Sequence, residues 1–375
     1  MLKLIIKLWI YFFSLHGTTA TSKAIELSHY NICSNIIGFS SAIEYRPDDT
    51  ILSFLPIHHT FECTVTFLTG IYNGCCISIC EGLRYILQDL VTYKVSIMVS
   101  VPLVLENMYR KICEQVALYG NTLTNEQILA SLGGRLRFAI VGAAALGKDV
   151  ILGLKKFGII VCQGYGLTET SPVLSVETNQ DSNPGSIGYA LPGVTIEIDN
   201  PDSNGLGEII CKGPNVMLGY HNNPEATKEV LKDGWFHTGD LGYVDDKGFL
   251  FISGRKKSVI VLKNGKNIFP EEIEVVLNNH PLVLESFVYP AISKKDNVEI
   301  RAKIVYNKEA VYAANGDISP EEIQKIFEEY RKEVNKSLPL YKFIRQVSIT
   351  DEPLIKTTTN KIRRNEEMKK MGLLY

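Results

Sequence analysis

Residues 95–119 read VSIMVSVPLVLENMYRKICEQVALY, a short apolar run followed by a longer stretch of helical character. The run at 138–141 (FAIV) and the stretch at 148–156 repeat this order of strand and helix. Apolar runs of this length suit strands that are covered on both faces, as in a parallel sheet. We therefore predict an α/β layered fold over residues 51–251, with a further strand at 77–79.

Residues 187–211 follow a different pattern. Short strand-like runs alternate there with turn sequences, LPG at 191–193 and NPDSNG at 200–205. Pro, Gly, Asn and Asp at such spacing predict a mostly antiparallel subdomain.

A second change of pattern comes near Gly254, where basic residues precede a helix, two strands and a further helix. Ser319 is the expected N-cap of that last helix, with Pro320 in its first turn and Glu322 completing a capping box. Such a segment of about 120 residues has the size of a separate α+β domain. We predict a large domain over residues 1–253 and a small mobile domain over residues 254–375.

The composition is that of an ordinary globular protein, with 45% apolar, 21% charged and 9% aromatic residues. Lys and Arg total 39 against 41 Asp and Glu, so there is no basic excess to neutralise a nucleic acid, and we expect no nucleic-acid partner. The cysteines lack the spacing of metal ligands. Reduced, buried thiols in a cytoplasmic protein explain them best, at positions 33, 63, 75, 76, 80, 113, 162 and 211.

The amino terminus allows two interpretations. Residues 1–13, MLKLIIKLWIYFF, combine two lysines with an apolar run, and small residues follow at 18–20 as in a secretory signal peptide. Alternatively the run is a buried strand that leads into a phosphate-binding turn, which we favour because of the motif that follows it. The sequence holds no stretch of roughly 20 apolar residues that would span a bilayer, so any membrane contact would be peripheral.

The most informative segment is GYGLTETSP at 164–172. Its two glycines flank Tyr165 and let the backbone approach a flat ligand closely. Thr168 and Glu169 offer hard oxygen donors of the kind that Mg²⁺ takes together with phosphate oxygens. Taken alone, the segment is better explained as an ordinary glycine-rich loop with a surface glutamate.

Further motifs follow it: GWFHTGD at 234–240, GRKK at 254–257, KNGKNIFPEEIE at 263–274 and TTTNKIRR at 357–364. In this order and spacing they resemble the adenylate-forming superfamily of acyl-CoA synthetases, luciferases and peptide-synthetase adenylation domains. The sequence is most similar to bacterial long-chain fatty acyl-CoA synthetases, because of KNGKNIFP and of LPIHHTFE at 55–62.

The resemblance implies a role for each matching residue. Lys361 would stabilise negative charge on the α-phosphate and the carboxylate during adenylation, as a catalytic residue together with Thr168 and Glu169. Glu169 and Thr18 would bind Mg²⁺, and Lys257 would lie at the hinge of the small domain. The resemblance assigns nucleotide binding to Gly17, Thr18, Thr19, Lys23, Gly164, Tyr165, Gly166, Asp240 (ribose hydroxyls) and Arg255 (ribose or phosphate).

The phosphate loop departs from the family pattern of Thr-Ser-Gly-Thr-Thr-Gly, a spacer and Lys-Gly. His16 stands in place of serine, and Ala20 and Ala24 stand in place of glycines. Where a loop glycine has positive φ, alanine costs on the order of 1 kcal/mol, so we expect weaker phosphate binding.

The acyl pocket is expected at two segments. His58 and His59 could instead belong to a metal site with Glu62, but adjacent histidines project differently and no further ligand is near, so we favour the pocket. Small residues at Gly142, Ala143 and Ala144 would let the backbone border a long acyl chain.

The resemblance also predicts an N-terminally truncated large domain, because family members carry a long portion before the phosphate loop. The chain would then be a mis-started, split or decayed gene product, with a separate chain as one possible source of the missing portion.

The leading hypothesis is ATP- and Mg²⁺-dependent activation of a long-chain fatty acid to acyl-adenylate, followed by transfer to CoA. The alternatives are an adenylate ligase serving a carrier protein and an inactive nucleotide-binding fragment. The resemblance argues against an amino acid substrate, because amino-acid-activating relatives carry an Asp for the ammonium group in the segment that matches residues 55–62, which contain none.

Overall fold

The computed structural model describes residues 10–15, 23–119, 123–262, 266–292, 298–356 and 362–373, and for residues 10–15 the backbone alone. These residues form two compact units. The first takes in residues 23–238 and 242–252 with the strand at 10–15, and the second takes in residues 239–241 and those from 253 onward.

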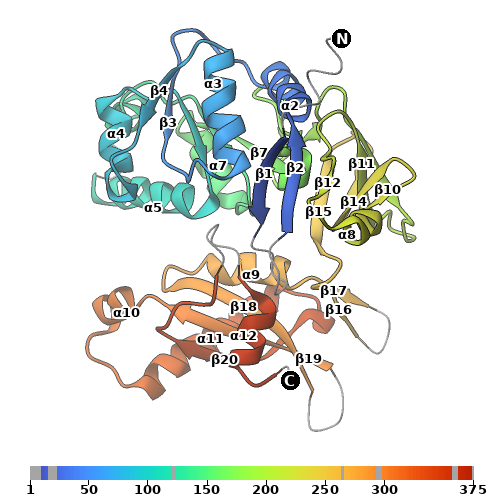
Figure 1. The fold of residues 1–375 in the computed structure, drawn as a ribbon. Helices are drawn as coiled ribbons and strands as arrows, with labels where there is room; N and C mark the ends of the chain where they lie inside the picture. The colour runs from blue at the N-terminus through green and yellow to red at the C-terminus, as the bar shows by residue number, and fades with distance from the viewer. Residues whose placement is uncertain are drawn as a thin grey trace, which may run out of the picture. The chain divides into compact units, whose positions relative to one another are not determined.

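A seven-stranded sheet forms the centre of the first unit (Figure 1). Its first five strands are parallel and its last two are antiparallel. This confirms the predicted α/β layer and the strands expected near 77–79, 95–99 and 138–141. In spatial order the strands are β4 (Cys76–Ile79), β3 (Thr50–Ser53), β5 (Ile97–Ser100), β6 (Phe138–Val141), β7 (Ile160–Gly166), β8 (Val173–Val176) and β9 (Tyr189–Ala190).

Helices cover both faces of this sheet, because successive side chains of a strand point to opposite sides. Met98 of β5 packs into one apolar cluster, and its neighbours Ile97 and Val99 pack into another. The first cluster contains side chains from α4 (Ile86–Thr92), α5 (Pro102–Tyr119), α6 (Asn125–Ser131) and α7 (Lys148–Lys156). The second contains side chains from α2 (His29–Ala42) and the π-helix η1 (Phe61–Leu68), which continues into α3 (Thr69–Tyr72).

Antiparallel strands complete the first unit, as predicted for residues 187–211. One sheet comprises β10 (Thr195–Asp199), β11 (Gly207–Lys212), β14 (Trp235–Val244), β13 (Leu231–Lys232) and β15 (Leu250–Arg255), of which β14 and β15 run on into the second unit. The other comprises β1 (Ile10–Leu15), β2 (Lys23–Ser28) and β12 (Gly219–Tyr220), with α8 (Pro224–Val230) after it. The apolar amino-terminal run is thus a strand over the part that the structure describes.

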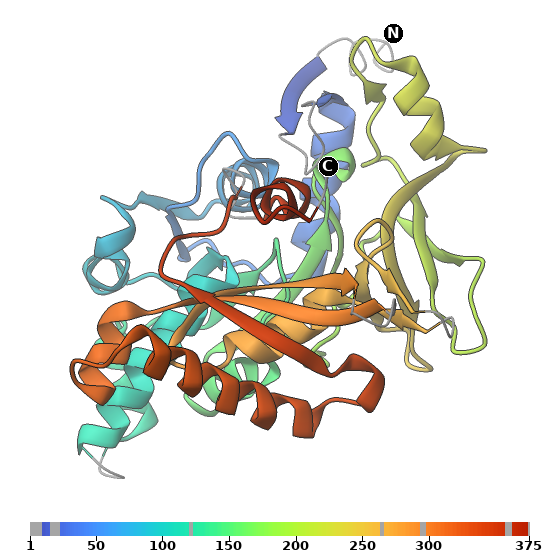
Figure 2. The ribbon, with the colours of Figure 1, turned by 90° about the horizontal axis from the view of Figure 1, so that it is seen from below.

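The second unit is an α+β fold. Ser319 caps α11 as predicted: its hydroxyl accepts a hydrogen bond from the Glu322 amide at 3.3 Å, and its own amide donates to Glu322 Oε2 at 2.8 Å. Helix α11 lies along the central sheet (Figure 2). That sheet is β18 (Val283–Ile292), β19 (Val298–Tyr306) and β20 (Ile344–Thr350), with α9 (Pro270–Asn278), α10 (Lys308–Asn315), α11 (Pro320–Ser337), α12 (Arg364–Lys370) and the pair β16 (Ile260–Val261) and β17 (Asn267–Ile268).

Burial of the cysteines was predicted for all eight, and this is wrong for several. Cys162 and Cys211 are buried, but Cys33 lies on the outward face of α2 and Cys76 begins β4, and both are exposed. Helix and strand periodicity turn these two side chains to solvent although their neighbours are apolar. All eight are free thiols.

Strand β4 is an edge of the seven-stranded sheet. Apolar side chains are exposed on it and close to it in sequence: Ile79 is 73% exposed, and Ile71, Tyr72 and Leu83 are also exposed. Such apolar surface next to an open strand edge favours association with other chains. Within the described ranges, none of the helices combines the length and the apolar character needed to cross a membrane.

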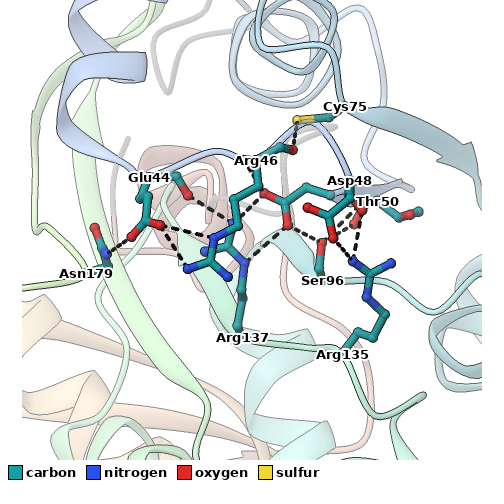
Figure 3. A network of polar contacts seen from close by, with 10 residues as sticks. Glu44, Arg46, Asp48, Thr50, Cys75, Ser96, Arg135, Arg137 and Asn179 are labelled. Atoms are coloured by element: carbon teal, nitrogen blue, oxygen red, sulfur yellow. Dashed lines mark hydrogen bonds and ion pairs between the residues drawn. The ribbon is translucent and has the colours of Figure 1, made fainter.

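A polar network joins the amino ends of three parallel strands (Figure 3). Asp49, directly before β3, forms an ion pair with Arg137, directly before β6. The hydroxyl of Ser96, directly before β5, donates to Asp49 Oδ1 at 2.7 Å. Burial raises the pKa of Asp49, but the hydrogen bonds from Arg137 and Ser96 outweigh burial and hold the pKa below its usual value. The network therefore fixes these strand ends around one buried carboxylate.

Candidate active site

The segment 164–172 leaves the carboxyl end of β7, where ligands of α/β sheets usually bind. Its turn is tightly closed, since the Leu167 amide donates to the Pro172 carbonyl at 3.0 Å and to Thr170 Oγ1 at 3.0 Å. A Cβ on Gly166 would lie 1.8 Å from the Pro172 carbonyl oxygen, so only glycine fits there. The turn carries Glu169 in a short 3₁₀ segment, η4 (Thr168–Thr170).

Two buried asparagines hold this turn. Asn35 of α2 donates from Nδ2 to the Val173 carbonyl at 2.7 Å and accepts from the Val173 amide at 3.2 Å. Asn215 donates to the carbonyls of Thr170 and Val173, both at 3.0 Å. Because both side chains bond to backbone, they fix the path of the turn whatever its side chains are.

Glu169 lies buried within this turn and contacts a residue that the motifs do not single out. The phenol of Tyr220 donates to Glu169 Oε1 at 2.9 Å, and the Lys23 ammonium lies 4.4 Å from the centre of the Tyr220 ring. Burial, then the charge of Glu169 and this hydrogen bond, raise the pKa of Tyr220, so the phenol stays a donor. Two of the predicted site residues, Lys23 and Glu169, are thus linked through Tyr220.

The donors described here fit a magnesium ion. Glu169 supplies a buried carboxylate and Thr168 a half-buried hydroxyl, and hard oxygen atoms are the ligands that Mg²⁺ prefers. The predicted ligand Thr18, with Gly17 and Thr19 of the phosphate loop, lies outside the described residues.

Asp240 and Arg255 are adjacent in the second unit. Arg255 Nε lies 3.1 Å from Asp240 Oδ1, and Asp240 is buried whereas Arg255 is half exposed. A carboxylate with two oxygens suits the vicinal hydroxyls of a ribose. Lys257 is exposed in the turn that follows β15. Lys361 lies outside the described residues.

One of the residues predicted for the acyl pocket, Gly142, makes a contact that the sequence did not reveal. A Cβ on Gly142 would lie 3.0 Å from the Phe61 ring, so the ring packs directly against the Gly142 backbone. His58 is exposed and His59 is half-buried, with their ring centres 4.4 Å apart. The Phe61 ring therefore lies in the space beside Gly142.

Glu62 does not complete a metal site with the two histidines. Its carboxylate accepts hydrogen bonds from Ser53 at 2.6 Å and from Thr66 at 2.8 Å, and burial raises its pKa although these bonds oppose the rise. The pocket interpretation of His58 and His59 stays a prediction.

A different set of possible metal ligands lies on the antiparallel sheet. In the described part of the chain, Asp199, Glu208 and His237 have ligand atoms within 4.8 Å of one another. Asp199 and Glu208 are direct cross-strand partners, and His237 Nδ1 lies 3.3 Å from Glu208 Oε2. The His237 ring thus contacts the Glu208 carboxylate directly.

Ala143 has a left-handed backbone, with φ of 72°. This conformation costs an alanine about 1–2 kcal/mol. We expect Ala143→Gly to stabilise the protein by about 0.5 kcal/mol, after the loss of about 0.4–1 kcal/mol for the greater freedom of glycine in the unfolded chain. Chemical denaturation checks this, with Ala144→Gly as the control, since Ala144 lacks positive φ and should lose stability. Equal losses of stability in both variants would contradict the backbone strain inferred at Ala143.

Comparison with known proteins matches this chain to AMP-binding enzymes, among them CoA ligases and acyl-CoA synthetases. A family model described as "AMP-binding enzyme" matches residues 16–221. The chain is 36% identical over 307 residues to probable 4-coumarate–CoA ligase 2 of Dictyostelium discoideum, covering 78% of this chain and 53% of that protein. It is 32% identical over 313 residues to the peroxisomal long chain acyl-CoA synthetase 7 of Arabidopsis thaliana, covering 73% of this chain and 45% of that protein.

Two solved structures with bound ATP are also similar to this chain. ATP-bound MatB from Rhodopseudomonas palustris has a TM-score of 0.76 at 28% identity, covering 96% of this chain and 68% of that one. O-succinylbenzoate coenzyme A synthetase from Bacillus subtilis, in complex with ATP and magnesium, has a TM-score of 0.77 at 25% identity, covering 95% and 69%. The chain spans about half the length of the curated relatives it matches.

Proposed function

Because the chain belongs to the AMP-binding enzyme family, we propose that it acts as an ATP-dependent acid–CoA ligase. The observation that carries this proposal is the buried Glu169 at the carboxyl end of β7, tied through Tyr220 to Lys23. A carboxylate and an ammonium group in one place suit a divalent cation and the phosphates of a nucleotide.

The proposed reaction has two steps. A carboxylate oxygen attacks the α-phosphorus of ATP, and pyrophosphate leaves with the electron pair of the broken P–O bond. The thiol of CoA then attacks the acyl carbon, loses its proton, and AMP leaves. Bound magnesium would neutralise part of the triphosphate charge. Lys23, Thr168 and Glu169 would bind phosphates and ion, Gly164, Tyr165 and Gly166 the adenine, and Asp240 and Arg255 the ribose.

For the second unit we propose the role of a mobile lid over residues 254–375, with Lys257 at its hinge and Lys361 as its catalytic residue. A lid of this kind lets one site serve both steps, because rotation withdraws one set of groups and brings in another. We place the enzyme in the cytoplasm, on the strength of its eight free thiols.

The proposed acid is a long-chain fatty acid. The support comes from the small residues Gly142, Ala143 and Ala144 and from the relatives named long-chain acyl-CoA synthetases. A planar aromatic acid is the second candidate, because the Phe61 ring packs on Gly142 and a 4-coumarate–CoA ligase is similar to this chain at 36% identity.

Pyrophosphate exchange into ATP tests both candidates. With the full chain and Mg²⁺, we expect palmitate to support exchange better than 4-coumarate, and acetate to support little, because a longer chain buries more apolar surface on binding. A higher rate with 4-coumarate would assign the aromatic substrate instead. No exchange with any acid, while binding of ATP persists, would favour the inactive nucleotide-binding alternative.

A further inference from the structure

Tyr220 is held in place by the strand that begins at Lys23. Strand β12 pairs antiparallel with β2, so that Tyr220 lies opposite Ile25 and Gly219 opposite Glu26. The His221 amide donates to the Ala24 carbonyl at 2.8 Å, just beyond this pairing. The position of Tyr220 is therefore tied to the segment that carries Lys23.

The segment that leads into β12 is also bonded to the turn that carries Glu169. The Met217 amide donates to the Glu169 carbonyl at 2.8 Å, and the Tyr220 phenol reaches the Glu169 carboxylate three residues further on. Glu169 is thus held at both its main chain and its side chain by one short segment. A carboxylate offers about four lone-pair sites, and a phenol donor at one of them constrains the plane of the group.

We propose that Tyr220 is a positioning residue, which orients the Glu169 carboxylate for a divalent cation and holds the Lys23 ammonium beside it. The proposal rests on the function proposed above, because it assigns the cation to a nucleotide complex. Its physical basis is preorganisation: groups that orient a ligand of a metal ion typically change the affinity for that ion by about 10- to 100-fold when they are removed.

Tyr220→Phe is the direct test, because it keeps the ring beneath Lys23 and removes only the hydrogen bond to Glu169. Mn²⁺ takes oxygen ligands as Mg²⁺ does and is visible by electron paramagnetic resonance, so binding is measured in the full chain with ATP and without turnover. We expect the Mn²⁺ dissociation constant to rise about 10-fold in Tyr220→Phe.

Tyr45→Phe is the matched control. The Tyr45 hydroxyl is also buried, and it has no hydrogen-bond partner within the described residues, so its removal should leave the Mn²⁺ affinity unchanged. A loss of affinity in Tyr45→Phe equal to that in Tyr220→Phe would show a general effect of losing a buried phenol and would overturn the proposal.

Glu169→Ala separates positioning from a purely structural role. If Tyr220 acts through Glu169, adding Tyr220→Phe to Glu169→Ala should weaken Mn²⁺ binding no further, because without the carboxylate the phenol has no ligand to orient. A full additional 10-fold loss in the double variant would overturn the proposal, as would an unchanged affinity in Tyr220→Phe alone. Absence of ATP-dependent Mn²⁺ binding in the unmodified protein would instead overturn the proposed function.

Discussion

Replacing Lys361 with alanine is expected to lower the rate of acyl-adenylate formation by about 100-fold or more. We propose Lys361, in the motif at 357–364, for the adenylation step, where a cation stabilises negative charge that gathers on the α-phosphate and the attacking carboxylate. Transfer from a preformed acyl-adenylate to CoA should stay within about threefold, because no phosphoryl bond forms in that step. Pyrophosphate exchange measures the first step, and thioester formation from synthetic acyl-adenylate measures the second.

Lys370→Ala is the control for this variant. Lys370 is an exposed lysine of the same carboxyl-terminal segment, paired with Glu352 at 3.0 Å, and it belongs to none of the motifs. Both steps should proceed at unchanged rates in Lys370→Ala. Equal losses of both steps in Lys361→Ala would refute the role assigned to Lys361.

Replacing Arg137 with methionine is expected to destabilise the first unit by about 3–5 kcal/mol. Methionine keeps most of the side-chain length but leaves the Asp49 carboxylate, which is 1% exposed, without its ion-pair partner. The hydrogen bonds from the Ser96 hydroxyl and the Arg46 amide remain and do not neutralise the charge. Denaturant unfolding of the full chain measures the loss.

The neighbouring pair Arg135–Asp48 supplies the matched control. It has the same chemistry and an Nη2–Oδ2 distance of 2.7 Å, but both side chains are well exposed. Arg135→Met should therefore cost no more than about 1 kcal/mol. Similar losses in the two arginine variants would contradict the importance of burial.

The loss of stability in Arg137→Met is expected to depend on pH in a definite direction. In the folded protein the pKa of Asp49 lies below its usual value, so the network stabilises the fold above the ordinary aspartate pKa of 3.8 and loses this effect as the pH falls through the folded pKa. In Arg137→Met, burial is opposed by the hydrogen bonds from Ser96 and the Arg46 amide but no longer by the guanidinium, so the pKa of Asp49 rises and the carboxyl is protonated at higher pH. The stability difference between the two proteins should narrow as the pH is lowered from 7 towards 4.

Much of the fold follows from local spacing. The runs at 138–141 and 148–156 become β6 and α7 with the predicted bounds, and Ser319 and Glu322 close the predicted capping box. Periodicity, capping residues and turn residues act over a few positions, so they can be read without knowing the rest of the chain. The burial predicted for Cys33 and Cys76 was wrong, because local spacing does not show which face of a helix or an edge strand stays uncovered. That face depends on the elements that pack beside it.

The sequence by itself determined the α/β layers, the order of the motifs and the chemical character of Glu169 and Lys23. Only the tertiary structure brought Tyr220 to Glu169 across 51 residues, packed the Phe61 ring on Gly142, and paired Asp49 with Arg137 across 88 residues. These contacts join strands and turns that are adjacent only after the sheets have assembled. Their register is set by the packing of whole elements, and no local spacing encodes it.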